Sequence, residues 1–163
     1  MIYSMEGKVH ELGGWAMANL ELIFSELVRW QIELWNAVDA RLRTDFDLPL
    51  SRYEPMRVIE RRGQCRVNDI ATELLITVGG TSKLVDRIEG SGHCRRRPNP
   101  EDGRSSVIEL TPSGSRLLAQ AKVALEEELS ARLGVALSAG ELRQFTTILT
   151  KVRAVEGKSG TVS

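Results

Sequence analysis

The feature of the chain that most constrains its fold is a long segment, from Trp15 to about Arg43, that contains neither proline nor glycine. From Trp15 to about Arg43 the apolar residues recur at helical spacing, and they include Leu20, Ile23, Phe24, Leu27, Val28, Ile32, Trp35 and Val38. This spacing predicts one long helix with a wide apolar face. Such a face is hard to cover in a chain of 163 residues, and a partner subunit is one way to cover it.

A second helix is predicted beyond Asp47-Leu48-Pro49, which breaks the first helical pattern. Ser51 and Glu54 have the spacing of a capping box. Pro55 would then fall in the first turn, where proline costs least. Gly63 is expected to end this helix.

Two short helices joined by a tight turn follow, at about 68–74 and 78–89. Thr77 is placed to cap the second by accepting a backbone N–H, and Gly90 and Gly92 supply its end. The positions expected to face inward on this second helix are Leu84, Val85 and Ile88. A pair of this kind is typical of a helix-turn-helix motif.

A two-stranded hairpin is predicted directly after this motif. The segments 93–97 and 105–110 flank the turn-rich loop 98–103. Ile108 and Leu110 alternate with a glutamate, as a half-buried strand requires. A hairpin in this place predicts the wing of a winged helix-turn-helix.

Two further helices are predicted after the hairpin. Thr111-Pro112 places a cap and a proline at the start of a helix that runs to about Leu133. Ser138 and Glu141 form a second capping box, and the helix that it starts reaches about Val155. The fold class is therefore mainly α.

Composition narrows the functional classes. The formal net charge is zero, with two cysteines and two histidines, so neither a uniformly basic protein nor a disulfide framework is expected. No apolar run approaches the roughly 20 residues that cross a bilayer, and residues 1–14 do not resemble a signal peptide. A cytoplasmic, reduced location without membrane contact is expected. We find no nucleophile motif, phosphate loop or carboxylate pair with histidine, so we expect no enzyme activity, cofactor or metal.

Basic residues are locally enriched in the motif and its hairpin. Residues 77–105 hold six Lys and Arg against four Asp and Glu. Four more arginines precede the motif, namely Arg57, Arg61, Arg62 and Arg66. Local clustering of this kind is the pattern that contact with DNA requires.

Three stretches of the chain resemble the MarR (multiple-antibiotic-resistance regulator) family. Residues 76–89, ITVGGTSKLVDRIE, look like the family's recognition helix. Residues 96–106, RRPNPEDGRSS, resemble its wing, with Asp102 and Arg104 filling the Asp-x-Arg pattern. LTPSG at 110–114 matches the way in which the wing feeds the next helix. Two positions depart from the pattern: Gly103 stands where relatives often have a basic residue, and His93 where they often have an apolar one.

The resemblance implies one MarR-like domain over residues 1–163 that forms an obligate homodimer. Residues 15–46 and 112–156 would form the dimerisation helices, residues 51–111 the DNA-binding lobe and residues 157–163 a flexible tail. The dimer would bind a pseudo-palindromic operator in double-stranded DNA. A small phenolic or aromatic effector, or oxidation, would regulate it.

The candidate DNA-binding residues lie on the recognition helix and the wing. They are Thr77, Gly79, Gly80, Thr81, Ser82, Lys83, Arg87, Arg96 and Arg104. Two glycines in sequence suggest close approach to the DNA, and Thr81, Ser82 and Lys83 suggest contacts in the major groove. Arg87 could reach a phosphate or pair with a wing carboxylate.

The wing has its own division of roles. Arg104 is placed to enter the minor groove. Asp102 is placed to hold a nearby arginine and shape the loop. Since Arg95, Arg96 and Arg97 alternate faces on a strand, at least one of the three must point away from DNA.

Several other residues can be interpreted as either structural or functional. Cys65 and Cys94 could form a redox switch but are more simply structural thiols. His93 lacks enough partners for zinc, since His10 is the only other histidine. Trp30 and Trp35 could line an effector pocket, although aromatic residues at helical spacing are more often core or interface.

Three functions therefore compete. The first is a homodimeric repressor released by a small effector. The second is a DNA-binding activator or architectural factor without an effector. The third is a scaffold that keeps the winged fold for protein contacts, which the basic helix and wing disfavour. A thiol-based redox regulator is a further alternative to the first.

Overall fold

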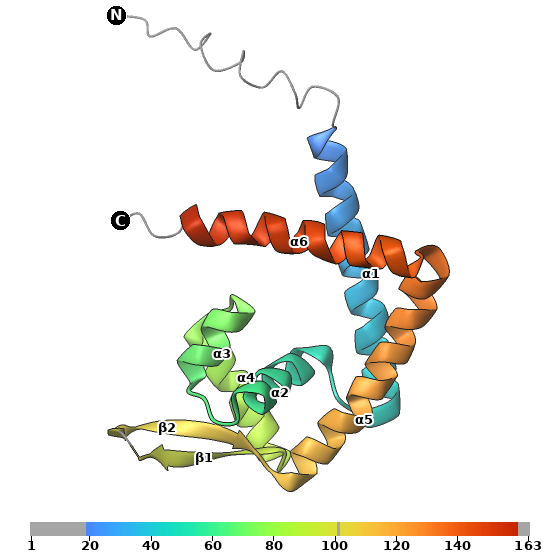
Figure 1. Cartoon of the computed structure of the whole chain (residues 1–163). Helices are drawn as coiled ribbons and strands as arrows, with labels where there is room; N and C mark the ends of the chain where they lie inside the picture. Colours follow the sequence, from blue (N-terminus) through green and yellow to red (C-terminus); the bar gives the residue numbers. More distant parts are fainter. Residues whose placement is uncertain (1–18, 101, 160–163) are drawn as a thin grey trace, which may run out of the picture. The chain divides into compact units, whose positions relative to one another are not determined.

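The computed structural model describes residues 19–100 and 102–159, with only the backbone given for residues 103, 104 and 155–159. The elements in chain order are α1 (Leu20–Phe46), α2 (Leu50–Arg62), α3 (Val67–Leu74), α4 (Val78–Gly90), β1 (Cys94–Asn99), β2 (Asp102–Leu110), α5 (Pro112–Leu129), the π-helical turn η3 (Ser130–Gly134) and α6 (Ala139–Ser159) (Figure 1). The mainly helical architecture with a two-stranded wing is confirmed. The chain divides into two compact units, residues 1–36 and 37–163, with the division inside α1.

The described part of the first unit is the N-terminal portion of α1. The helix begins at Leu20 because the Asn19 side chain accepts a hydrogen bond from the backbone N–H of Leu22 at 3.0 Å. The predicted long helix is confirmed from Leu20 onward, whereas residues 15–18 lie outside the described residues. Eight of its large apolar side chains are 40–68% exposed, namely Leu20, Leu22, Ile23, Phe24, Leu27, Val28, Ile32 and Trp35.

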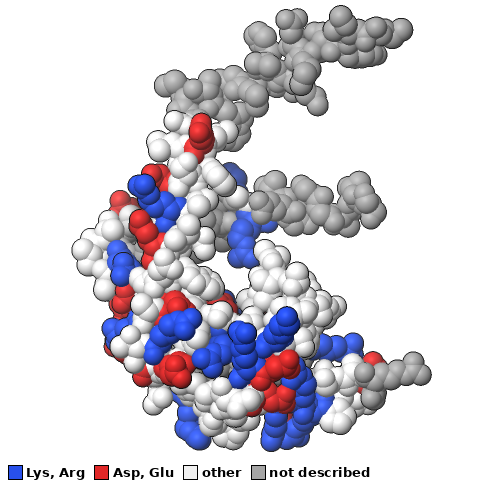
Figure 2. Space-filling model, turned by 180° about the vertical axis from the view of Figure 1, so that it is seen from behind, with Lys and Arg blue, Asp and Glu red and all other residues white. Residues whose placement is uncertain are grey.

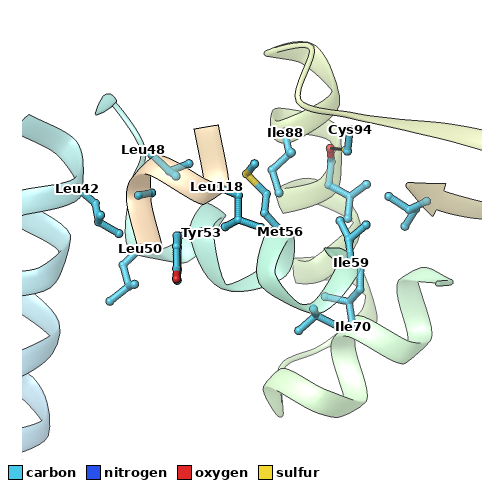
Figure 3. Close-up of a cluster of buried hydrophobic side chains, with 14 of the residues drawn as sticks. Leu42, Leu48, Leu50, Tyr53, Met56, Ile59, Ile70, Ile88, Cys94 and Leu118 are labelled. Carbon is cyan, nitrogen blue, oxygen red and sulfur yellow. Dashed lines mark hydrogen bonds between the residues drawn. The ribbon is translucent and has the colours of Figure 1, made fainter. Parts of the chain in front are cut away.

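The second unit is organised around one apolar cluster, with α2 at its centre (Figure 3). Tyr53, Met56 and Ile59 of α2 are fully buried. The other elements contribute buried side chains around them, among them Leu42 of α1, Ile70 of α3, Ile88 of α4, Ile108 of β2 and Leu118 of α5. This cluster holds the recognition elements on a common core.

The start of α2 differs from the predicted capping box. The helix begins at Leu50 with no capping side chain from its own N-terminus, so Pro55 lies in the second turn, not the first. A more distant residue does the work, because the Asp39 carboxylate accepts the Leu50 N–H at 2.7 Å. Glu54 instead pairs with Arg57 at 2.7 Å. Gly63 ends α2 with φ of 74°, as predicted.

The wing is longer than predicted. Strands β1 and β2 pair antiparallel from Cys94 opposite Leu110 to Asn99 opposite Asp102. The expected loop 98–103 is therefore mostly strand, because Pro98 and Asn99 belong to β1 and residues 102 and 103 to β2. Cys65 forms an isolated bridge to β2, since its backbone exchanges hydrogen bonds of 3.2 and 2.7 Å with Ile108. The wing is thus attached to the segment between α2 and α3.

Hydrogen bonds join the base of the wing and the end of α4 to the start of α5. The Thr111 hydroxyl caps α5 by accepting the Gly114 N–H at 3.0 Å, as predicted. The same hydroxyl donates to the carbonyl of Gly92 at 2.7 Å, and the Thr111 N–H donates to the carbonyl of His93 at 3.1 Å. Gly114 is buried here, and a Cβ on it would lie 1.9 Å from the His93 carbonyl oxygen. The chain therefore passes from α4 through the wing and back to the same point.

The C-terminal helices follow the predicted order with two differences. The predicted helix to Leu133 changes from α to π geometry at Ser130. The Ser138–Glu141 capping box is confirmed, with the Ser138 N–H donating to Glu141 at 2.8 Å. The last helix extends to Ser159, so residues 157–159 of the expected tail are helical, while residues 160–163 lie outside the described residues. Among the described residues, none of the helices combines the length and apolar character that crossing a membrane requires.

Candidate nucleic-acid interface

The helix-turn-helix of α3 and α4 is set by local capping and a shared core. Thr77 caps α4 through its hydroxyl, which accepts the Gly80 N–H at 3.1 Å. Val85 and Ile88 are buried as predicted, whereas Leu84 is only half-buried. Because one stripe of α4 packs inward, the opposite stripe faces solvent.

The exposed stripe of α4 carries two cations. Lys83 and Arg87 are exposed and lie four residues apart, so they share a face of the helix. Neither side chain has an ion-pair partner in the part of the chain that the structure describes. Arg87 therefore forms no pair with the described wing carboxylates, which leaves it available to a phosphate. Thr77, Gly79 and Gly80 are exposed at the start of the same helix, and Ser82 is half-buried.

Thr81 does not belong to this exposed surface. Its side chain is fully buried, and its hydroxyl donates to the Thr77 carbonyl at 2.9 Å. The prediction that Thr81 contacts DNA is therefore wrong. The spacing of Thr81, Val85 and Ile88 marks all three as one inward stripe, and this periodicity could have identified it from the sequence.

Arg96 is bound within the protein. Its guanidinium pairs with Asp86 at 2.6 Å and with Glu89, both on α4, and its backbone N–H donates to Glu89 at 2.8 Å. Burial by itself lowers the pKa of Arg96, but the hydrogen bonds to the two carboxylates outweigh it and raise the pKa above its ordinary value. Arg96 thus links strand β1 to the recognition helix, and its contact with DNA stays a prediction.

Arg95 and Arg97 lie on the other face of β1. Both guanidinium groups pair with Glu109 on β2, Arg97 at 2.6 Å. The hydrogen bond from Arg95 is the main cause that lowers the pKa of Glu109. The predicted alternation of the three arginines is confirmed, since Arg96 points to α4 and its neighbours to the cross-strand glutamate.

The tip of the wing is organised by a residue that the sequence analysis missed. Asn99 is buried, and its side-chain amide donates to the Ser105 hydroxyl at 2.9 Å. That hydroxyl also donates to the Asp102 carbonyl at 3.1 Å. The signal was an asparagine between two prolines, which is typical of a turn that its own side chain closes. Asp102 is exposed, and the role of its carboxylate in shaping the loop stays a prediction. Arg104 lies on β2, and its side chain is outside the described residues.

The arginines before the motif are largely paired within the fold. Arg57 pairs with Glu54, and Arg61 and Arg62 pair with Glu73. Arg66 is exposed at the start of α3. In the face drawn in Figure 2, red surface accordingly lies between blue patches over the winged-helix part. Three of the four arginines before the motif are thus paired with carboxylates.

The two cysteines have the environment of structural thiols. Cys65 and Cys94 are free and buried. Burial raises the pKa of each thiol to about 11, so the reactive thiolate is scarce at neutral pH. The described residues contain no group of three His, Cys, Asp or Glu side chains that could hold a metal ion, and His10 lies outside them.

The tryptophans suggested for an effector pocket both lie on α1 in the first unit. Trp30 is half-buried and Trp35 is 41% exposed. Their participation in a pocket stays a prediction.

Comparison with known proteins gives consistent results. The MarR family model matches residues 48–106. YfiV of Bacillus subtilis, an HTH-type transcriptional regulator, is 30% identical over 71 residues, which cover 44% of this chain and 44% of that relative. The chain thus spans less than half the length of this relative.

Solved structures extend the likeness to most of the chain. Sco3205, a MarR family regulator from Streptomyces coelicolor solved in complex with DNA, aligns with a TM-score of 0.76 and 22% identity over 85% of this chain and 92% of that one. The transcriptional repressor CouR, bound to a 23-mer DNA duplex, aligns with a TM-score of 0.72 and 24% identity over 94% and 99%. Residues 48–106, which hold the winged helix-turn-helix, thus match the MarR family model, and most of the chain has the fold of MarR family regulators.

Proposed function

We propose that this protein is a sequence-specific regulator of transcription that binds double-stranded DNA in the cytoplasm. The observation that carries the proposal is the outward stripe of α4, where Lys83 and Arg87 are exposed without an ion-pair partner among the described residues. Ion pairs of Arg96 hold the wing beside this helix. In winged motifs of this kind α4 lies in the major groove and the wing reaches the neighbouring minor groove, where Arg104 would enter.

The working form is proposed to be a homodimer. The support is apolar surface that each unit leaves open. In the first unit, α1 exposes eight large apolar side chains, among them Phe24 at 68% and Leu20 at 57%. In the second, α6 exposes Ile148 at 52% and Val152 at 56%. Exposed apolar area on this scale is a feature of protein interfaces. A two-fold dimer would read a pseudo-palindromic operator with two copies of α4.

Repression and release by a small phenolic or aromatic effector complete the proposal. CouR, one of the structural neighbours, is a transcriptional repressor. An effector screen against the DNA complex distinguishes this form from an activator or architectural factor without an effector. The buried thiols, with pKa values of about 11, disfavour regulation by oxidation.

Binding to duplexes from the gene's own upstream region, over several salt concentrations and with an unrelated duplex as control, tests the proposal. Tight binding to one segment that weakens steeply with salt is expected, because phosphate contacts release counterions. Equal and weak binding to every duplex at low salt would refute it and direct attention to protein partners.

A further inference from the structure

The start of α4 presents apolar and bare backbone surface where a recognition helix meets base edges. Val78, the first residue of the helix, is 50% exposed, and Ile76 before it is 40% exposed. The Thr77 hydroxyl is engaged as the cap. The two residues after Val78 are Gly79 and Gly80. The first turn thus offers an apolar side chain beside uncovered backbone.

Gly79 has no explanation inside the protein. A Cβ added to it would meet no atom within 4 Å, and its backbone does not have the positive φ that favours glycine. Gly80 differs, because a Cβ there would lie 3.0 Å from the Thr77 hydroxyl and disturb the cap. Glycine in a helix costs about 1 kcal/mol relative to alanine. The absence of a side chain at Gly79 therefore suits a surface that comes close from outside.

The charges beside this surface select its partner. Lys83 lies one turn beyond Gly79 on the exposed side of the same helix, and Arg87 one turn further, and cations that follow an exposed first turn fit a groove between two rows of phosphates. Within the major groove, the apolar group that a base presents is the 5-methyl group of thymine. We infer that Val78, with Gly79 beside it, reads thymine methyl groups in the DNA site, and that these contacts contribute to sequence specificity. This inference rests on the proposed function.

The test replaces thymidine with deoxyuridine, which pairs identically but lacks the methyl group. A duplex selected by the protein from a random-sequence library is resynthesised with deoxyuridine at one position at a time. At one thymine in each half-site, affinity is expected to fall about fourfold, which corresponds to burial of one methyl group at about 0.8 kcal/mol. In Val78→Ala this preference for thymidine should fall to about one. Val123→Ala, which truncates a valine exposed on α5, is the matched control and should keep the full preference.

Gly79→Ala gives a second readout that does not depend on folding defects. Because the added methyl meets open space in the free protein, Tm should rise by about 2 °C. The same methyl should weaken DNA binding by about tenfold, because it clashes with the approaching base edges. A rise in Tm together with loss of affinity separates a DNA contact from a structural role.

The outcomes distinguish a failure of the methyl-reading inference from a failure of the proposed function. Tight, selective binding that is indifferent to deoxyuridine at every position overturns the methyl-reading inference and leaves the proposed function intact. Deoxyuridine sensitivity that Val78→Ala retains also overturns the assignment to Val78. If the library yields no preferred duplex, the proposed function fails and the inference falls with it.

Discussion

Arg96 shows how the surroundings of one side chain decide its role. From sequence it is one of three consecutive arginines near a DNA-binding motif. In the folded chain it lies between Asp86 and Glu89, and its charge is neutralised by the recognition helix. A guanidinium with two carboxylate partners contributes little net attraction to a phosphate. We therefore expect Arg96 to act mainly by joining β1 to α4, and to add little to the attraction for phosphate.

Replacing Arg96 tests this role. Arg96→Ala should weaken operator binding by about tenfold, comparable with one mismatched base pair, because the wing loses its attachment to α4. The dependence of log affinity on log salt should keep its slope. The matched variant Lys83→Ala should reduce that slope by about one if the exposed Lys83 ammonium neutralises a phosphate. A reduced slope in Arg96→Ala would instead return Arg96 to the DNA contacts.

The cysteines give a pH-dependent prediction. Because burial raises the pKa of Cys65 and Cys94 to about 11, the folded state favours the protonated thiols. Their contribution to the free energy of unfolding is complete below the ordinary thiol pKa of about 8.5 and is lost as the pH rises towards 11. Denaturant unfolding at pH 8 and pH 10.5 should show a larger loss in the wild type than in a Cys65→Ala, Cys94→Ala variant. Equal losses in the two proteins would contradict this assignment.

At the scale of the elements, local signals in the sequence were sufficient wherever a cap and its helix are neighbours. Thr77, Thr111 and the Ser138–Glu141 box were correctly identified, since each cap bonds within three residues. The start of α2 was wrong because its N–H is satisfied by Asp39, eleven residues earlier and on another helix. The partners of Arg96 were missed for the same reason. In both cases the partner lies on another element of the fold, and local sequence patterns do not identify such a partner.

The joint between the wing and α5 supplies a prediction at this scale. Gly114→Ala should destabilise the protein by about 1–3 kcal/mol or more, because its Cβ would overlap the His93 carbonyl, which is backbone and cannot turn away. Gly134→Ala is the control, since a Cβ there meets only the Ser130 side chain at 3.5 Å. Thermal unfolding of both variants measures the difference. A Gly114→Ala protein as stable as the wild type would show that the joint is not closely packed.

At the scale of the whole molecule, each unit exposes large apolar side chains that a partner subunit could cover. Burying such residues against a partner subunit would stabilise the complex by roughly 25 cal/mol for each Å² of apolar surface removed from water. Among the described residues, α1 exposes eight large apolar side chains, whereas α6 exposes three.

The proposed dimer is tested by charge placed within the exposed apolar stripe of α1. Leu27→Glu puts a carboxylate at a position that is 43% exposed in the single chain. It should reduce the dimer to a monomer in analytical ultracentrifugation and abolish operator binding at the same protein concentration, because an unpaired charge in an apolar interface is costly. Ser25→Glu, which adds the same charge at a polar exposed position, should leave both intact. A stable Leu27→Glu dimer with full binding would remove this stripe from the interface.

The hydrogen bonds from Thr111 to Gly92 and His93 attach the start of α5 to the segment that follows α4. Since α5 has 18 residues, its far end lies about 27 Å from that joint. A displacement of about 2 Å at the far end corresponds to a rotation of only about 4–5° about that joint. A rigid α5 would thus convert a displacement at its distant end into a small rotation of the segment between α4 and β1, where Thr111 bonds to Gly92 and His93 and the buried Gly114 packs against His93.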